Sequence, residues 1–341
     1  MKKKPVRIKH VAIVALCIVV AAAAIASWRI FSMPGLQPMN LTLVAKDGTA
    51  LALDEKALGE FTPYESRGGF KTSVGSLRGI GEYTGVPILA LCSRVGGIDD
   101  TCSVRITAGD GYSMVFTYDQ ANGRSFTTFN PATGDEVFCD HQLTVVLAYH
   151  HNGENLPVDE GPLRLAILNS EGLLTEGHWW VKCIVKIEVR SAIEEWALLL
   201  KGALVENMTR ATFESGVNEH CHGVNWTDSN HNVWTGMPLW LLVGRVDDGN
   251  VHETNSSVRA FNDTLALQGY IVKVVTGQGY SCEFASNSTR YMRSSDIILA
   301  NGLNGAPLPE PYWPLKLIGK GLLSNEMLGN VVEIQIIFPG S

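Results

Sequence analysis

From residue 40 onward, apolar and polar side chains alternate along many short segments, with the two-residue period of half-buried β-strands. In two places an alternating run enters a glycine-containing turn and leaves it again, which predicts a β-hairpin. The two hairpins cover 104–116, around Gly109–Gly111, and 272–284, around Gly277–Gly279. The pattern predicts an α+β fold that is rich in β-structure.

Two longer alternating runs predict strands with one apolar face. The residues expected to share that face are Val181, Cys183, Val185, Ile187 and Val189 in one run, and Val332, Ile334, Ile336 and Phe338 in the other. Helical signals are short. Proline opens expected helices at Pro87–Val95 and Pro238–Val243, while Asp54 and Thr209 are expected N-caps of helices through Leu58 and Phe213.

Several phrases occur twice, in the same order and at an offset of about one domain. The pairs are Thr84–Ile88 with Thr235–Leu239, Asp110–Ser113 with Gln278–Ser281, Asn152–Pro157 with Asn304–Pro309, and Gly161–Leu165 with Trp313–Leu317. Solenoid repeats are only about 20–50 residues long, so this repeat indicates a duplicated domain. We expect a first domain at 40–190 and a second at 195–341.

The N-terminus predicts an export signal. A basic leader at 1–10 precedes an uncharged apolar run at 11–28, and a Pro/Gly-containing linker follows at 29–39. Eighteen residues of helix span about 27 Å, close to a bilayer core, and the positive charge keeps the leader in the cytoplasm. This predicts a single-pass membrane anchor with the rest of the chain outside the cytoplasm; the alternative is a cleaved signal peptide and a secreted protein.

Composition and charge limit the classes of binding partner that we expect. The chain has 341 residues, of which 45% are hydrophobic and 18% charged, as in a folded globular protein. Its formal net charge is −7, and the part beyond the basic leader is more acidic still. An acidic surface argues against a nucleic-acid partner. The expected partners are the membrane, through the N-terminal helix, and a protein or further copies of the chain at the cell surface.

Six sequons fit an exported glycoprotein of an archaeon or a eukaryote. Their asparagines are Asn40, Asn207, Asn225, Asn255, Asn262 and Asn287. The alternative is a loop composition rich in Asn, Ser and Thr. An even number of cysteines beyond the anchor favours disulfides in an oxidising compartment; Cys92 and Cys102, which bracket a short loop, are the expected pair.

In their order, the repeated phrases resemble the molybdopterin-binding domain of the sulfite oxidase family. That family places a Thr/Ser-Gly-Val-Pro-Leu helix start before an Asp-Gly-Tyr hairpin, an Asn-Gly loop with Leu-Pro, a Gly-x-Pro-x-Arg-Leu segment and a Val-Lys-Trp strand. The resemblance covers nearly the whole chain after the linker. It implies two tandem sulfite-oxidase-like domains behind the transmembrane helix, with a molybdopterin cofactor and oxidoreductase activity.

The resemblance also implies roles for individual residues. A cysteine thiolate would bind molybdenum, and basic groups would hold the phosphate and pterin of the cofactor. Cys221 lies in a suitable region of the second domain, and the basic candidates are Arg164, Lys182 and Lys316. The first domain lacks the thiol and the second lacks the lysine of the closing strand. Alternatively, Arg164 pairs with a carboxylate such as Glu160, and Lys182 is a solvated strand residue.

A separate cluster suggests metal binding. His220, Cys221 and His222 supply imidazole and thiolate groups that suit zinc or copper. The alternative is an exposed loop with Cys221 in a disulfide, for example to Cys282. Seven tryptophans gather at the junction and in the second domain, where they are expected to build the interface between domains: Trp179, Trp180, Trp196, Trp226, Trp234, Trp240 and Trp313.

Three functions follow from these patterns. The first is a membrane-tethered protein with a degraded cofactor site and a binding or assembly role. The second is a working molybdenum-cofactor oxidoreductase that exchanges electrons with an extracytoplasmic carrier. The third is a surface metal-binding protein that uses the His-Cys-His cluster.

Overall fold

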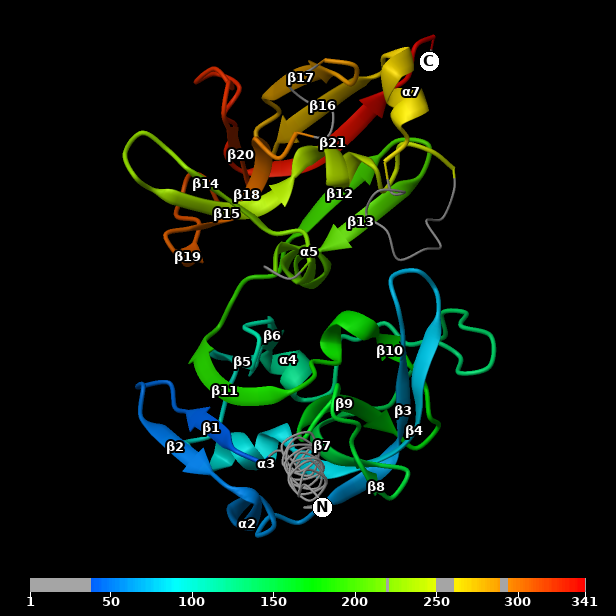
Figure 1. Ribbon diagram of the computed structural model, residues 1–341, viewed down its shortest axis with the longest axis vertical. Helices are drawn as coiled ribbons and strands as arrows, with labels where there is room; N and C mark the ends of the chain where they lie inside the picture. Colours follow the sequence, from blue (N-terminus) through cyan, green and yellow to red (C-terminus); the bar gives the residue numbers. More distant parts are fainter. Residues whose placement is uncertain (1–37, 219–220, 250–260, 289–293, 341) are drawn as a thin grey trace, which may run out of the picture. The chain divides into compact units, whose positions relative to one another are not determined.

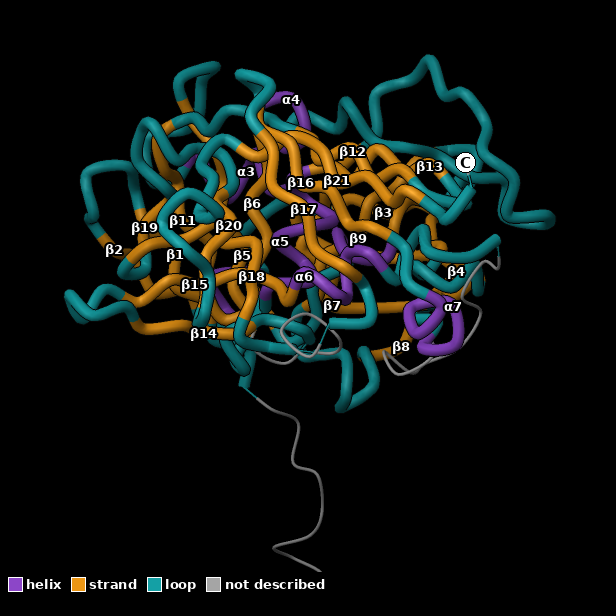
Figure 2. The backbone as a smooth tube through the Cα atoms, turned by 90° about the horizontal axis from the view of Figure 1, so that it is seen from above, coloured by secondary structure: helices purple, strands orange, loops and turns teal. Residues whose placement is uncertain are grey.

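The computed structural model describes residues 38–218, 221–249, 261–288 and 294–340 (Figure 1). Residues 39–341 form one compact unit. The basic leader, the apolar run and most of the linker lie outside the described residues. Among the helices of the described residues, none has the length and apolar character needed to cross a membrane. Strands dominate and helices are short (Figure 2), which confirms the β-rich α+β prediction.

Residues 41–191, here called the first half, form two sheets. In the first sheet the strand order is β2 (Ala50–Leu53), β1 (Leu41–Val44), β11 (Ile184–Ser191), β5 (Cys102–Ala108) and β6 (Ser113–Thr117). In the second it is β10 (Thr175–Glu176), β3 (Tyr64–Lys71), β4 (Leu77–Pro87), β7 (Thr144–His151) and β8 (Glu154–Asn155), with β9 (Arg164–Asn169) paired to β3 and β7. The strands β1 and β11 pair in parallel, so the half begins and ends in one sheet.

Residues 195–337, here called the second half, repeat much of this arrangement. The first of their two sheets has the order β13 (Val205–Thr209), β12 (Ala197–Lys201), β21 (Val331–Ile337), β16 (Ile271–Thr276) and β17 (Ser281–Ala285). The second has β14 (Val224–Thr227), β15 (Val233–Pro238), β18 (Ile297–Leu303) and β19 (Ala306–Pro307), with β20 (Lys316–Gly319) paired to β18. Again the opening and closing strands, β12 and β21, pair in parallel.

The four expected helices form close to their predicted bounds, as α2 (Glu55–Leu58), α3 (Ile88–Ser93), α5 (Arg210–Val217) and α6 (Leu239–Val243). Further helices are α4 (Tyr118–Ala121), the 3₁₀ turn η1 (Gly177–Trp179) and α7 (Asp263–Gln268). Asp54 and Thr209 accept hydrogen bonds from the first turns of α2 and α5, as expected of N-caps. Pro87 and Pro238 stand at the N-cap rather than inside their helices, and α5 runs past Phe213 to Val217.

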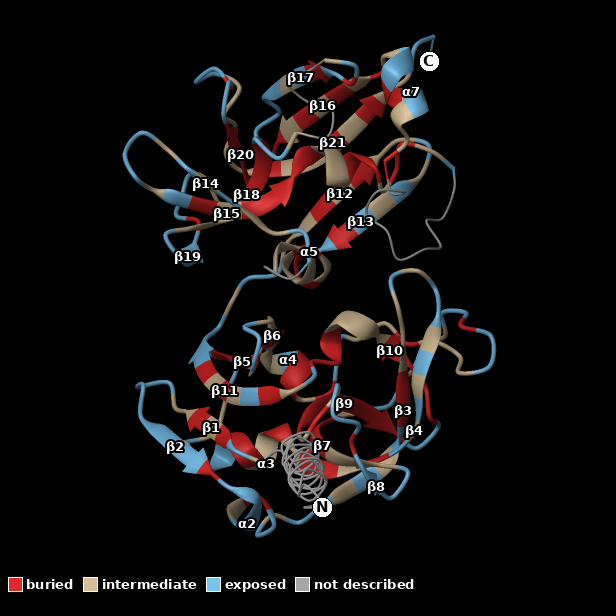
Figure 3. Cartoon of the chain, in the orientation of Figure 1, coloured by how far each residue is buried: buried red, intermediate tan, exposed pale blue. Residues whose placement is uncertain are grey.

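Burial differs from strand to strand within each half (Figure 3). All residues of β9 and β20 are buried, whereas β8 and β19 are exposed throughout. This is the distribution that burial of apolar side chains produces when sheets cover a common interior.

A backbone contact recurs in both halves and requires glycine. A Cβ atom added to Gly85 would lie 2.1 Å from the carbonyl oxygen of Leu147, and one added to Gly236 would lie 2.1 Å from that of Leu299. Each glycine also marks a register shift between its strand and the next, β4 with β7 and β15 with β18. A larger residue would push these strands apart, so the Thr-Gly of the repeated phrase is a packing requirement in both halves.

The predicted face of the closing strand in the first half is partly wrong. The strand begins at Ile184, and its register against β5 shifts between Ile184 and Lys186. The extra residue, Val185, is 43% exposed, while Ile184, Ile187 and Val189 are buried. A bulge changes which residues face inward, and the alternation of apolar and polar residues in the sequence does not reveal it.

Candidate functional site

Arg164 is fully buried at the start of β9, with 0% of its side chain exposed. Its Nη1 forms a short ion pair with Glu160, the carboxylate expected as its alternative partner. The guanidinium carbon lies 5.2 Å from the ring centre of Trp180, 5.6 Å from Phe70 and 5.8 Å from Tyr83. Cation–π contacts of this kind strengthen when they are desolvated. The charge of Arg164 therefore faces side chains of its own half.

Lys316 occupies the corresponding place in the second half, at the start of β20. Its side chain is 8% exposed, and its Nζ lies 3.5 Å from the ring centre of Tyr312 and 4.5 Å from that of Trp234. Burial lowers the pKa of Lys316, against the opposing effect of Asp228. Tyr83 and Trp234 directly precede the repeated Thr-Gly phrase, so each half sets an aromatic residue at this point against a buried cation.

Lys182 differs from these two residues because its side chain is 43% exposed. It lies 3.4 Å from Glu160, which therefore joins Arg164 and Lys182. Two of the expected cofactor residues are thus brought together by one carboxylate. Lys316 belongs to the other half and packs there against Tyr312 and Trp234.

Cys221 is exposed and lies near the turn between β5 and β6 of the first half, where it interacts electrostatically with Asp110 and Tyr112. Partial burial, followed by the negative charge of Asp110, raises the pKa of its thiol. Its backbone N–H donates to the carbonyl of Asn218, whose side-chain Oδ1 accepts the backbone N–H of Ser113 at 3.1 Å. Cys221 therefore lies beside the first half, in surroundings that disfavour a thiolate.

The predicted metal cluster is only partly described, because His220 lies outside the described residues. Within the described part of the chain, no group of three or more His, Cys, Asp or Glu side chains is placed to hold a metal ion. Cys221 and Cys282 are both free thiols. The cluster as a whole remains a prediction.

Cys92 and Cys102 are both buried, and the disulfide expected between them is not formed in the structure. Burial, and then the proximity of Cys102, raises the pKa of Cys92 to about 12, while the Cys102 thiol donates to Asp99 at 3.3 Å. Such cysteines behave as small apolar side chains in a core.

The sequons fall into three groups. Asn40, Asn207, Asn225 and Asn287 are exposed, and Asn255 lies outside the described residues. Asn262 caps α7 through its side-chain oxygen and donates from Nδ2 to Asp248 at 2.9 Å. Because its amide is already used, Asn262 is the least suitable glycosylation site of those described.

The two halves meet through α5, around a buried arginine that the sequence analysis did not single out. Arg210 is 2% exposed and pairs with Glu195 at 2.8 Å and, more closely, with Glu214. Its Nη2 also donates to the carbonyl of Val115 in the first half at 2.9 Å. Beside it, the hydroxyl of Tyr112 lies 3.0 Å from that of Ser215. A polar network therefore fastens α5 to β6.

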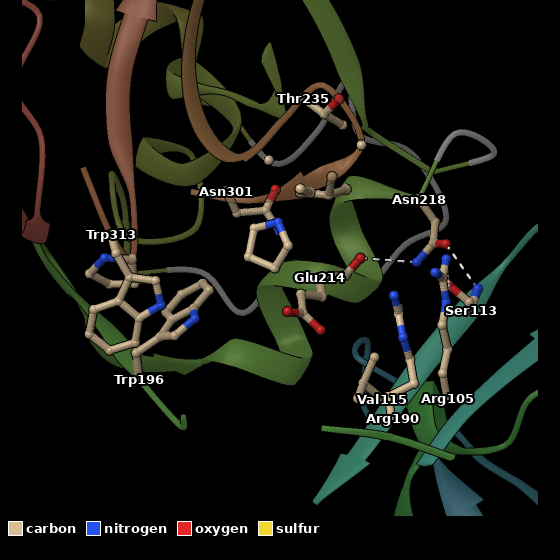
Figure 4. A pocket seen from close by; sticks show the side chains of 16 residues that line it. Arg105, Ser113, Val115, Arg190, Trp196, Glu214, Asn218, Thr235, Asn301 and Trp313 are labelled. Atoms are coloured by element: carbon tan, nitrogen blue, oxygen red, sulfur yellow. Dashed lines mark hydrogen bonds between the residues drawn. The ribbon is translucent and has the colours of Figure 1, made fainter. Parts of the chain in front are cut away.

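A cavity of about 300 Å³ lies next to this network (Figure 4). The first half contributes Arg105, Ser113, Val115 and Arg190; the second contributes Trp196, Glu214, Val217, Asn218, Thr235, Asn301, Gly302, Gly305, Ala306, Pro307, Trp313 and Pro314. In Figure 4 the two indoles lie toward one side of the cavity and the two arginines toward the other. Charged, amide and aromatic groups thus converge on a space large enough for a small molecule.

Of the cavity residues, Trp196 and Trp313 were expected members of a domain interface. Several others lie in the repeated phrases, which predicted no cavity: Ser113, Thr235, Gly305, Ala306, Pro307 and Pro314. Trp179 and Trp180 instead belong to the core of the first half. Arg105 and Arg190 lie 85 residues apart in sequence on neighbouring strands, and only the strand pairing brings them to one face. Alternation in each strand separately gives no sign that the two charges meet.

No protein-family model matches the chain, and no curated protein sequence matches it. Among solved structures, it is similar to the sulfane dehydrogenase SoxCD from Paracoccus pantotrophus, with a TM-score of 0.35 and 12% sequence identity. The match covers 77% of this chain and 61% of that chain, so the chain spans about three fifths of the length of that structure.

Proposed function

We propose that this protein is a membrane-tethered, extracytoplasmic binding protein built from two sulfite-oxidase-like domains, 40–190 and 195–341. In this proposal the cationic positions of an ancestral cofactor site have become internal structural links. The observation that carries it is Arg164, which is fully buried and engaged by Glu160 and three aromatic rings.

The division into two related domains is supported by features that recur in both halves. One sheet of each half has the same five-strand order with a parallel pair of opening and closing strands. Asn152 and Asn304, both with φ near +50°, use their side-chain oxygens to accept backbone N–H groups of the neighbouring strand at 2.9 and 2.8 Å. A left-handed asparagine at the same point of each half is a demanding coincidence without common ancestry.

The residues present do not fit a molybdopterin cofactor. A pterin phosphate needs free cations that can reach it. Arg164 is wholly buried, Lys316 is covered by aromatic rings, and the exposed Lys182 is paired with Glu160. Molybdenum needs a thiolate, and partial burial and Asp110 both disfavour ionisation of Cys221. We therefore assign no redox step to these residues and prefer a binding role.

Elemental analysis of the full-length protein, purified from membranes of its native host, tests this proposal. We expect far less than one molybdenum or tungsten atom per chain. A near-stoichiometric amount of either metal would overturn the binding role in favour of an oxidoreductase. Stoichiometric zinc or copper that is lost in Cys221→Ser but kept in Cys282→Ser would overturn it in favour of the His-Cys-His metal site.

A further inference from the structure

We propose that the cavity beside α5 binds a small organic anion, in which a carboxylate or phosphate is attached to a flat ring. The inference rests on the proposed binding role and names the ligand class for it. Two guanidinium groups would hold the oxyanion, and the two indoles would cover the ring.

The arginines are placed on one face by strand pairing. Arg190 of β11 lies opposite Ser103 of β5, and Arg105 follows Ser103 by two residues, so both arginines point to the same side of the sheet. Such diagonal neighbours have their Cα atoms about 7–8 Å apart, within reach of one another for long side chains. Both line the cavity, and Figure 4 shows their side chains rising together toward α5.

Their charges are incompletely neutralised. Arg105 donates from Nε and Nη2 to the Ser113 hydroxyl at 3.2 and 3.0 Å, which fixes its position and leaves further N–H donors. Arg190 is exposed and forms no ion pair with the described residues. Two carboxylates lie nearby. Glu214 is already paired with Arg210, and Glu188, directly opposite Arg105 in the strand register, is paired with Lys186 at 3.1 Å. An oxyanion between the two guanidiniums would relieve their repulsion and accept bidentate hydrogen bonds.

The opposite side of the cavity is apolar and flat. Trp196 and Trp313 are both half-buried, so part of each indole faces the cavity. Trp196 is held edge-on against Phe213, with ring centres 5.4 Å apart. Pro307 and Pro314 add rigid apolar surface. Aromatic faces of this kind favour stacking with an unsaturated or aromatic ring of the ligand.

Size and rigidity set the ligand class. A volume near 300 Å³ is at the lower end for small-molecule sites, so the cavity suits one ring with one acidic group rather than a peptide or polymer. Asn218 stiffens the wall, because its amide donates to the Glu214 carbonyl at 2.9 Å and accepts the backbone N–H of Ser113. A wall tied to both halves is a preformed one, which lowers the entropic cost of binding.

The test is isothermal titration of the full-length chain in detergent. The probes are phenyl phosphate and benzoate, with benzyl alcohol as the neutral ring and inorganic phosphate as the anion without a ring. We expect one of the two ring anions to bind, and both benzyl alcohol and inorganic phosphate to bind at least about tenfold more weakly than it. The arm that binds more tightly, phosphate or carboxylate, identifies the acidic group.

Variants locate the site. Arg190→Gln changes an exposed side chain, so the fold is retained, and we expect binding of the ring anion to weaken by about tenfold or more, the effect of one charge-assisted contact. The matched control, Arg78→Gln on the exposed surface of β4, is expected to bind as the unmodified chain does. Trp313→Ala should weaken phenyl phosphate more than inorganic phosphate.

Three results would overturn the inference: no probe binding up to about 10 mM, equal binding of benzyl alcohol and the ring anions, or equal binding by the Arg190→Gln and Arg78→Gln variants. These failures differ from failure of the proposed function, which is detected as bound molybdenum or tungsten and does not depend on the probes.

Discussion

Replacement of Arg164 by methionine tests whether this residue is a structural link. The side chain is 0% exposed, with one carboxylate partner and three surrounding rings. Methionine keeps an unbranched apolar chain of comparable volume but shorter reach, and it removes the guanidinium with its charge and hydrogen-bonding groups. The change therefore separates the electrostatic role of Arg164 from its volume.

The expected loss follows from opposing terms. Breaking a buried ion pair from one side costs about 3–5 kcal/mol, and desolvated cation–π contacts add about 1–2 kcal/mol. Two terms reduce this sum. Glu160 is 21% exposed and keeps Lys182 at 3.4 Å, and the variant removes two buried nitrogens, Nε and Nη2, that have no hydrogen-bond acceptor. We expect Arg164→Met to lower the free energy of unfolding by about 2–3 kcal/mol.

The assay is urea denaturation followed by tryptophan fluorescence, with Trp180 as a reporter beside the changed residue. Lys182→Met is the matched control, because it removes the other cation of Glu160 from a 43% exposed site; it should cost less than about 1 kcal/mol. The double variant Arg164→Met with Glu160→Gln should recover part of the loss. If Arg164→Met is as stable as the unmodified chain, or no less stable than Lys182→Met, the structural role is refuted.

Two other predictions concern buried groups. Burial lowers the pKa of His178 from 6.5 to about 4. Between about pH 6.5 and pH 4, His178 is therefore protonated in the unfolded chain but neutral in the folded chain. As the pH falls through that range, the free energy of unfolding should fall by up to about 3 kcal/mol. Thermal melts at several pH values should show a weaker pH dependence of stability for His178→Asn. The exposed control His231→Asn should keep the pH dependence of the unmodified chain. Gly85→Ala and Gly236→Ala each place a Cβ 2.1 Å from a carbonyl oxygen, so each should lose about 1–3 kcal/mol, whereas Gly249→Ala, with open space around it, should melt as the unmodified chain does.

Local signals in the sequence predicted local structure well. Asp54 and Thr209 cap helices because capping depends on a side chain and the three residues that follow it. The hairpins around Gly111 and Gly279 form for the same reason, with both glycines at positive φ. What the sequence could not predict depends on distant strands: the bulge at Val185 requires knowledge of the register against β5.

In the candidate site, too, local features could be predicted from the sequence, whereas features that depend on distant residues could not. The sequence selected Arg164 and Lys316 by their place in a repeated phrase, yet whether a cation faces a ligand or its own core depends on residues far along the chain, such as Phe70 for Arg164. The arginines of the cavity were missed because no local motif contains them. Their meeting follows from β5 pairing with β11, and the indoles opposite come from the second half.

The two buried cations stand at corresponding positions of the two halves but have different partners. Arg164 has a carboxylate partner as well as rings, whereas Lys316 lies over two rings and feels Asp228 as its opposing charge. A shared ligand would have required both cations to keep the same open, ligand-facing geometry. A structural role requires only that each charge be compensated, by whichever partners the local core supplies. The different partners at corresponding positions fit such a structural role. Under the proposed binding function, they favour the cavity between the halves, rather than either buried cation, as the ligand site.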